Sequence, residues 1–308
     1  MKKLLCLVMI LLLLPAACLA ETVVTSFYPI YLFALNLTEG LEGVTVANMA
    51  GVNTGCLHDY QLQTSDMKLL AKADLFLING AGMENFLEDV TGTFPALPVV
   101  DASAGIELMA AESENETYDH DHDHEDEHHD HSHEYNAHVW LDAGNAQIMV
   151  SNLAQGLMDA MPDRADAIAA NRDAYLQRLK TLDAQVTERL AKLERKDIIT
   201  FHEAFPYFAQ AYGLNVAAVV NREHDDALSP ARLAELVGIV KELGVPPLFV
   251  EPQYKDLAAT TIANETGAQI YTLDPIVTGP AEDVPLTYYE DVMLQNVQTL
   301  EAALGAAE

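Results

Sequence analysis

The sequence predicts an α/β fold of two similar lobes with mostly parallel sheets, joined by one long rigid helix. Short strand-like runs alternate with helical runs in both halves of the chain, which is typical of a parallel sheet covered on both faces. Between these halves lies a stretch, residues 163–196, without glycine or proline. With 308 residues, the chain is also roughly twice the usual ~100–200 residues of a single domain, so it can supply two lobes.

The first twenty residues are expected to be a secretory signal and not part of the fold. Two lysines precede the apolar run Leu4–Leu14, which is too short to span a bilayer but suits the core of a signal peptide. We expect cleavage after Ala20 and a mature protein in the periplasm. The alternative is cleavage before Cys18 and a lipid anchor on that cysteine, but Pro15 stands where a lipobox normally has leucine.

The charge balance argues against nucleic acid and anionic membranes as partners. The chain has 47 acidic and 16 basic residues and a net charge of −31. Without residues 1–20 the balance is 47 acidic against 14 basic residues, or −33, and such a surface repels negatively charged polymers. An internal disulfide would then need Cys18 to pair with Cys56, so the core is expected to be stable without one.

The N-terminal lobe is expected to occupy residues 21–162. Its predicted strands are 22–26, 44–49, 74–78 and 98–100, and its predicted helices are 29–37, 64–71, 84–90 and 145–160. Thr64-Ser65-Asp66 supplies the cap of one helix, and Asn79-Gly80 ends the third strand.

A histidine-rich and acidic loop, residues 112–134, interrupts this lobe. It has eleven acidic residues and almost no apolar ones, so it cannot form a core. Seven of the eleven histidines of the chain lie in it: His120, His122, His124, His128, His129, His131 and His133. We expect the loop to be solvated and to hold divalent ions weakly.

Residues 163–196 are expected to form the helix that braces the two lobes. Apolar residues spaced by three and four form one continuous stripe. They are Tyr175, Leu179, Leu182, Val186, Leu190 and Leu193. At ~1.5 Å per residue this helix would reach ~50 Å, which is longer than one small lobe needs.

The C-terminal lobe, residues 197–308, is expected to repeat the alternation of the first lobe. Its predicted strands are 198–201, 216–220, 248–250 and 269–273, and its predicted helices are 229–244, 255–265 and 288–304. Ser229 as cap and Pro230 in the first turn begin the first of these helices.

Four side chains outside the loop are candidate metal ligands. Ligands bind beyond the carboxyl ends of parallel strands, and His202 and Asp274 each directly follow a predicted strand. His58 and His138 lie in the N-terminal half, so two donors per lobe would converge on a cleft. Three imidazoles and one carboxylate suit tetrahedral Zn²⁺, whereas Mn²⁺ prefers more oxygen. The spacing matches no local metal motif, so from the residues alone ordinary hydrogen-bonded histidines stay an alternative.

Motifs around these residues resemble, in order, those of the zinc-binding solute-binding proteins of ABC metal importers, the cluster A-I type. The motifs are Leu57-His58-Asp59-Tyr60-Gln61 with Ser65-Asp66, His138-Val139-Trp140-Leu141-Asp142, Phe201-His202-Glu203-Ala204-Phe205, Ser229-Pro230 and Leu273-Asp274-Pro275. The resemblance covers essentially the whole chain after residue 20. It implies two α/β lobes joined by a rigid helix, with a metal ion bound between them.

The resemblance also implies a function and a set of ligands. His58, His138 and His202 are expected to be the nitrogen ligands of Zn²⁺, with Asp274, a glutamate from a loop, or water in the fourth position. Relatives that carry Mn²⁺ typically have a carboxylate where this chain has His202, which favours zinc. The expected function is capture of Zn²⁺ and its delivery to the permease of an ABC importer, by a monomer that is not an enzyme. A periplasmic metallochaperone is a further candidate partner.

Other functions and other residues stay open. A zinc-dependent hydrolase also uses three histidines, with an open fourth position, and a metal-binding adhesin or a manganese-binding relative would share the fold. Cys56 is interpreted as a small packed thiol. Asp59 and Glu203 either orient the imidazole beside them or face solvent, and His224 is expected to be a polar loop residue near the cleft mouth.

Overall fold

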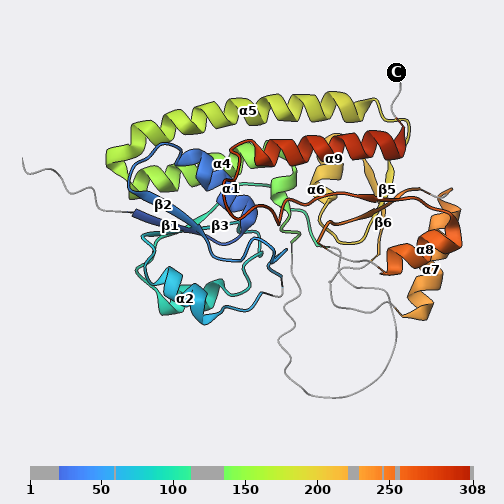
Figure 1. Cartoon of the computed structure of the whole chain (residues 1–308), viewed down its shortest axis with the longest axis horizontal. Helices are drawn as coiled ribbons and strands as arrows, with labels where there is room; N and C mark the ends of the chain where they lie inside the picture. Colours follow the sequence, from blue (N-terminus) through green and yellow to red (C-terminus); the bar gives the residue numbers. More distant parts are fainter. Residues whose placement is uncertain are drawn as a thin grey trace, which may run out of the picture.

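The structure of the protein is a computed structural model that describes residues 21–58, 60–111, 135–220, 229–244, 246–253 and 257–305. In these residues the chain forms two four-stranded parallel sheets, which lie toward opposite ends of the long helix α5 (Ala165–Ala191; Figure 1). The predicted fold class is confirmed. The expected signal peptide with Cys18, the loop 112–134, Asp59 and His224 lie outside the described residues.

The N-terminal sheet has the strand order β2-β1-β3-β4, and every pair of neighbours is parallel. Its strands are β1 (Glu21–Thr25), β2 (Val44–Asn48), β3 (Leu75–Ile78) and β4 (Val99–Asp101). The helices of this lobe are α1 (Tyr28–Leu37), α2 (Thr64–Leu70), α3 (Leu87–Thr93) and α4 (Ala143–Ala160). All four residues of β3 are buried, as expected of an inner strand covered on both faces.

The start of α3 differs from the prediction, which placed a helix at 84–90. The helix begins at Leu87 because Glu84 has another role. Its carboxylate accepts hydrogen bonds from the backbone N–H groups of Asn79 and Gly80, at 2.8 and 3.0 Å. These bonds stabilise the turn after β3, and burial raises the pKa of Glu84 to about 7, against the lowering effect of the hydrogen bonds.

The long connecting helix is shorter than predicted. A 3₁₀ turn, η2 (Pro162–Arg164), precedes α5 (Ala165–Ala191), so the helix is about 40 Å long at ~1.5 Å per residue. It ends at Ala191 because the chain then turns toward the first strand of the second sheet, and the Glu194 N–H donates to the Gly305 carbonyl at 3.0 Å. The predicted apolar stripe is buried and faces α4 and α9.

The C-terminal sheet has the order β6-β5-β7-β8, again all parallel. Its strands are β5 (Asp197–Thr200), β6 (Asn215–Val219), β7 (Leu248–Val250) and β8 (Ile270–Thr272). The helices are α6 (Pro206–Tyr212), α7 (Pro230–Glu242), α8 (Leu257–Thr266) and α9 (Tyr288–Leu304). The sequence did not predict α6, nor the 3₁₀ turn η1 (Val139–Leu141).

Two hydrophobic cores hold these layers together. The large core includes both faces of the N-terminal sheet, the buried stripe of α5, and one face of the C-terminal sheet through Ile198 and Phe249. A small core, with nine buried residues in the part of the chain that the structure describes, lies on the other face of that sheet, where Ile199 and Leu248 pack against α7 and α8. Neighbouring residues of a strand point to opposite faces, so the C-terminal sheet separates the two cores.

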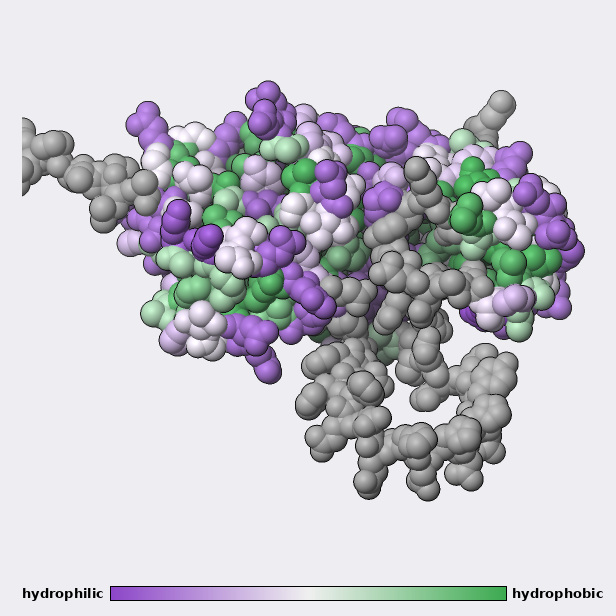
Figure 2. All heavy atoms as spheres, turned by 60° about the horizontal axis from the view of Figure 1, so that its bottom comes forward, coloured by the Kyte–Doolittle hydropathy of each residue, from purple (hydrophilic) through white to green (hydrophobic). Residues whose placement is uncertain are grey.

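On the face shown in Figure 2, hydrophilic and hydrophobic side chains are interspersed over the N-terminal lobe. Hydrophobic side chains are more frequent at the end of the molecule that holds α7 and α8 (Figures 1 and 2), where Leu243 and Leu257 are exposed. Among the described residues, no helix has the length and apolar character needed to cross a membrane.

Candidate metal centre

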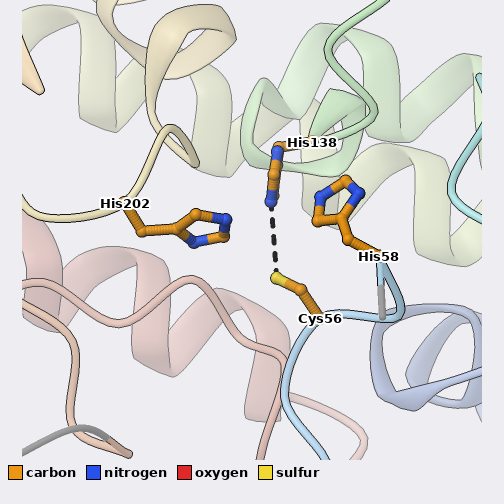
Figure 3. Close-up of side chains that lie close together, drawn as sticks. All are labelled: Cys56, His58, His138 and His202. Carbon is orange, nitrogen blue, oxygen red and sulfur yellow. Dashed lines mark hydrogen bonds between the residues drawn. The ribbon is translucent and has the colours of Figure 1, made fainter. Parts of the chain in front are cut away.

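Three histidines and one cysteine from distant parts of the chain meet at the junction of the two lobes. The side chains of Cys56, His58, His138 and His202 point toward a common space (Figure 3). One donor atom from each lies within 4.8 Å of those of the other three. The ring centres are 4.8 Å apart for His138 and His202, and 5.2 Å for His58 and His138. The structure thus brings together the three histidines that the sequence singled out.

Cys56 and His58 lie on the loop that follows β2. Gly55 has a φ of 83°, a left-handed conformation that favours glycine. Leu57, between the two donors, is fully buried in the large core, which anchors the loop while its neighbours face the site. The Asn85 amide also donates to the His58 carbonyl at 2.6 Å.

His138 is oriented by the side chain of Asn136. The Asn136 amide oxygen accepts from the His138 backbone N–H at 3.0 Å and lies 3.1 Å from Nδ1 of the ring. The amide nitrogen of Asn136 donates to the Glu203 carbonyl at 2.8 Å, so these partners fix which end of the amide is the acceptor. Nδ1 of His138 must therefore carry the proton, and Nε2 is left with the lone pair that binds a metal.

His202 is oriented by a carboxylate. Its Nδ1 lies 2.8 Å from Oε1 of Glu251, and the two side chains are only 5% and 3% exposed. Burial lowers the pKa of His202, but the charge of Glu251 and the hydrogen bond to it outweigh this effect, and the pKa is raised. A carboxylate that accepts from Nδ1 leaves Nε2 available and increases the basicity of the ring as a ligand.

Asn136 also connects the two lobes. Its amide binds the carbonyl of Glu203, the residue after His202, while its own carbonyl accepts from the Tyr207 hydroxyl at 2.9 Å. The same hydroxyl accepts from the Met109 N–H at 2.8 Å. The backbones that carry His138 and His202 are therefore held together by direct hydrogen bonds.

Asp274 lies near the site but outside the group of four donors. Its Oδ1 accepts from the Ile276 N–H at 2.7 Å, and its backbone is held by the Asn296 amide. Burial and the charge of Glu251 raise the pKa of Asp274 to about 6, against the lowering effect of the Ile276 hydrogen bond. The ligand role that the sequence predicts for Asp274 stays a prediction.

Cys56 has a closer relation to the histidines than the sequence indicated. Its sulfur lies 3.4 Å from Nε2 of His138. Burial and the charge of Glu251 raise the pKa of the thiol well above its ordinary value, so the sulfur carries a proton in the metal-free site and can donate it to Nε2 of His138.

Sequence reasoning missed Glu251 and Asn136. Glu251 directly follows β7, the same kind of position that drew attention to His202 and Asp274, so the strand-end rule would have found it. Asn136 had no such signal, because it is a polar residue next to an acidic loop and its role depends on partners far away in the sequence.

The chain is similar to known metal-binding proteins. Residues 23–303 match the family model described as zinc-uptake complex component A, periplasmic. A zinc-binding protein AdcA of Streptococcus pyogenes is 30% identical over 292 residues, which cover 92% of this chain and 56% of that protein. A manganese-binding lipoprotein MntA of Halalkalibacterium halodurans is 27% identical over 254 residues, 80% of this chain and 77% of that protein. The chain spans about half the length of the zinc-binding relatives.

Solved structures show the same fold. Zn(II)-bound AdcA of Streptococcus pneumoniae has a TM-score of 0.76 at 26% identity and covers 92% of this chain and 57% of that chain. The solute-binding protein FpvC of Pseudomonas aeruginosa, in complex with Mn²⁺, has a TM-score of 0.76 at 26% identity, over 92% of this chain and 98% of that one. The resemblance that the motifs indicated is thereby confirmed, and the chain belongs to the family of the periplasmic zinc-uptake complex component A.

Proposed function

We propose that this protein captures Zn²⁺ outside the cytoplasm and delivers it to the permease of an ABC importer. The observation that carries the proposal is the convergence of three imidazoles, two from the N-terminal lobe and one from the C-terminal lobe, on one space. His58, His138 and His202 are the proposed nitrogen ligands. Asp274 is the candidate for the fourth position that the sequence predicted.

The nitrogen-rich donor set supports zinc over manganese. Imidazole suits Zn²⁺, whereas Mn²⁺ prefers carboxylate and carbonyl oxygen. The similarity to a manganese-binding lipoprotein and to a Mn²⁺ complex makes manganese the second candidate. A competition titration of the purified protein with both ions decides between them: we expect one tight Zn²⁺ per chain and weaker Mn²⁺ binding, and a preference for Mn²⁺ would overturn the zinc assignment.

A site at the junction of two lobes suits transport. An ion held by donors from both lobes loses part of its ligands when the lobes separate, which provides a route to release. We infer that zinc is the cargo and that the protein is not a hydrolase, because the family model that matches the chain describes a component of a zinc-uptake complex. Zinc-dependent turnover of ester or peptide substrates would contradict this inference.

The cellular role has its own test. The proposed location is the periplasm, reached through the predicted signal peptide, and the proposed partners are the permease and a metallochaperone. Deletion of the gene should reduce growth when zinc is chelated, and added zinc should restore it. Unchanged growth under chelation would favour the adhesin alternative.

The histidine-rich loop is proposed to hold additional zinc weakly. Deleting residues 112–134 removes eleven acidic residues and none of the proposed ligands of the tight site. We expect the shortened protein to keep one tight Zn²⁺ and to bind fewer ions at saturation in equilibrium dialysis. Loss of the tight site with the loop would show that the loop itself is the primary site.

A further inference from the structure

Cys56 is positioned to be a metal donor and not only a packed thiol. Its sulfur and Nε2 of His138 are 3.4 Å apart. In a tetrahedral zinc site with Zn–S of about 2.3 Å and Zn–N of about 2.0–2.1 Å, the sulfur and nitrogen atoms are about 3.6 Å apart. The observed separation is therefore close to that of two ligands of one zinc ion.

The other donors are compatible with the same centre. The four donor atoms of Cys56, His58, His138 and His202 lie within 4.8 Å of one another, so small side-chain rotations bring all four to bonding distance of one ion. Figure 3 shows the sulfur of Cys56 pointing into the space between the three histidines. Asp274, the alternative fourth ligand, is outside this group.

The hydrogen bonds that orient the histidine rings are made by their Nδ1 atoms. Nδ1 of His138 lies against Asn136 and Nδ1 of His202 against Glu251, so Nε2 of each ring is the nitrogen that the proposed zinc ion would bind. The nitrogen that approaches Cys56 is Nε2 of His138. The sulfur therefore lies beside the nitrogen of His138 that is the proposed zinc ligand.

We propose that Cys56 is the fourth ligand of the zinc ion, so that the site is a closed tetrahedral set of three imidazoles and one thiolate. This proposal rests on the proposed zinc capture and specifies its chemistry. On binding, the sulfur–hydrogen bond breaks, a sulfur–zinc bond forms, and the proton leaves to solvent, since a thiol that coordinates zinc is deprotonated.

A thiolate ligand has a consequence for selectivity. Sulfur is a soft donor that favours Zn²⁺ and disfavours Mn²⁺, whereas a carboxylate is a hard donor. Replacing the sulfur by a carboxylate at the same position should therefore narrow the preference for zinc. Cys56 would then determine specificity and not only affinity.

The test uses the purified protein and four single variants: Cys56→Ser, Cys56→Asp, Asp274→Asn, and Thr54→Ala as a control on the same loop. Each is titrated with Zn²⁺ and Mn²⁺ against a chelator, and each is loaded with Co²⁺, whose complexes with thiolate absorb in the near ultraviolet. We expect the wild type, Asp274→Asn and Thr54→Ala to show the thiolate band and Cys56→Ser to lack it.

The affinities provide the second readout. Cys56→Ser should weaken zinc binding by at least the ~10–100-fold that loss of a contact supporting a ligand costs, and Cys56→Asp should reduce the ratio of zinc to manganese affinity. A tight zinc site without the thiolate band, unchanged in Cys56→Ser and weakened in Asp274→Asn, would overturn the role of Cys56 while zinc capture stands. A wild type that binds no zinc tightly would overturn both proposals.

Discussion

The two lobes have the same strand order but contribute different halves of the candidate metal centre. The N-terminal order β2-β1-β3-β4 becomes the C-terminal order β6-β5-β7-β8 when each number is raised by four. In the N-terminal half, His138 is oriented by the neutral amide of Asn136. In the C-terminal half, His202 is oriented by the buried carboxylate of Glu251, whose charge also raises the pKa of Asp274.

The two lobes also differ in the hydrophobic core that anchors their donor side chains. The loop with Cys56 and His58 is anchored through Leu57 in the large core. His202 lies between two cores, because Phe201 belongs to the small one and Ala204 to the large one. A shared topology therefore does not produce equal halves. In the N-terminal half a neutral amide orients His138, whereas in the C-terminal half a carboxylate orients His202 and carries a negative charge that a bound cation would neutralise.

The largest expected effect comes from removing a ligand on either side of the junction. His138→Ala and His202→Ala should each weaken zinc binding by more than about 100-fold, beyond the ~10–100-fold cost of losing a supporting contact. A titration of each variant against a chelator measures this, with the melting temperature in chelator as the control for folding. Tight binding that survives either substitution would remove that residue from the site.

Asn136 tests whether the two halves are coupled. Asn136→Ala removes the acceptor for Nδ1 of His138 and the bond to the Glu203 carbonyl, so we expect zinc affinity to fall by about 10–100-fold. Asn152→Ala is the matched control, because that amide also donates to two backbone carbonyls, of Ala102 and Ala104. An equal loss of affinity in both variants would show that Asn136 has no special role.

Glu251 tests the charge of the C-terminal half. Because the pKa of His202 is raised in the folded protein, its pairing with Glu251 contributes stability that is complete below the ordinary histidine pKa of about 6.5 and is lost as pH rises through the raised pKa. Glu251→Gln should therefore lower the free energy of unfolding of the metal-free protein by about 2 kcal/mol at about pH 5.5 and by less at about pH 8.

The control for this variant is Glu290→Gln. Glu290 pairs with Arg178 at 2.8 Å, and arginine keeps its charge over the whole range, so its effect should not shrink with rising pH. Denaturant unfolding at the two pH values measures both variants. A loss in Glu251→Gln that is independent of pH would contradict the assigned pairing with His202.

Asp274 tests whether the negative charge of the C-terminal half lowers the stability of the metal-free protein. Its pKa of about 6 lies above its ordinary value. The folded protein therefore loses stability as pH rises from about 4 to about 6, and this stability does not return at higher pH. Asp274→Asn removes this loss, and we expect the metal-free variant to be more stable than the wild type by about 1–2 kcal/mol at about pH 7, and equally stable at about pH 4.

Asp283→Asn provides the comparison for this substitution. Asp283 is exposed, in the same segment, with a φ of 51° that asparagine also tolerates, so its effect should be near zero. Thermal unfolding across the pH range separates the variants. An Asp274→Asn protein that is less stable than the wild type at neutral pH would show that the carboxylate is needed for the fold.

The smallest expected effect concerns motion of the C-terminal lobe. The small core holds α7 and α8 with nine buried residues, whereas α4 and α5 belong to the large core. Amide hydrogens of α7 and α8 should exchange faster with solvent than those of α4 and α5. Hydrogen exchange measured by mass spectrometry tests this, and equal protection of the two pairs would indicate one cooperative unit.

Much of the fold could be predicted because its signals are local. Short apolar strands, the Ser229 cap and the stripe of α5 are visible in the sequence, and each appears in the structure. Helix ends were less predictable, because Glu84 uses its side chain to hold a distant turn. The predicted domain boundaries at 162/163 and 196/197 stay predictions.

The candidate site was predictable only in part. The three histidines carried motifs, but their convergence required the structure. The position of Cys56 depends on how Gly55 and Leu57 direct the loop, and the role of Asn136 depends on a carbonyl 67 residues away. Such contacts come from tertiary packing, which the local sequence pattern does not contain.

We propose that both lobes hold one zinc ion at the same time. Anomalous diffraction at the zinc absorption edge from crystals of the zinc-loaded protein tests it most directly. We expect one strong peak about 2.0–2.1 Å from an imidazole nitrogen of His138 in the N-terminal lobe and of His202 in the C-terminal lobe. A zinc ion bound by residues of one lobe only, or away from these histidines, would contradict this proposal.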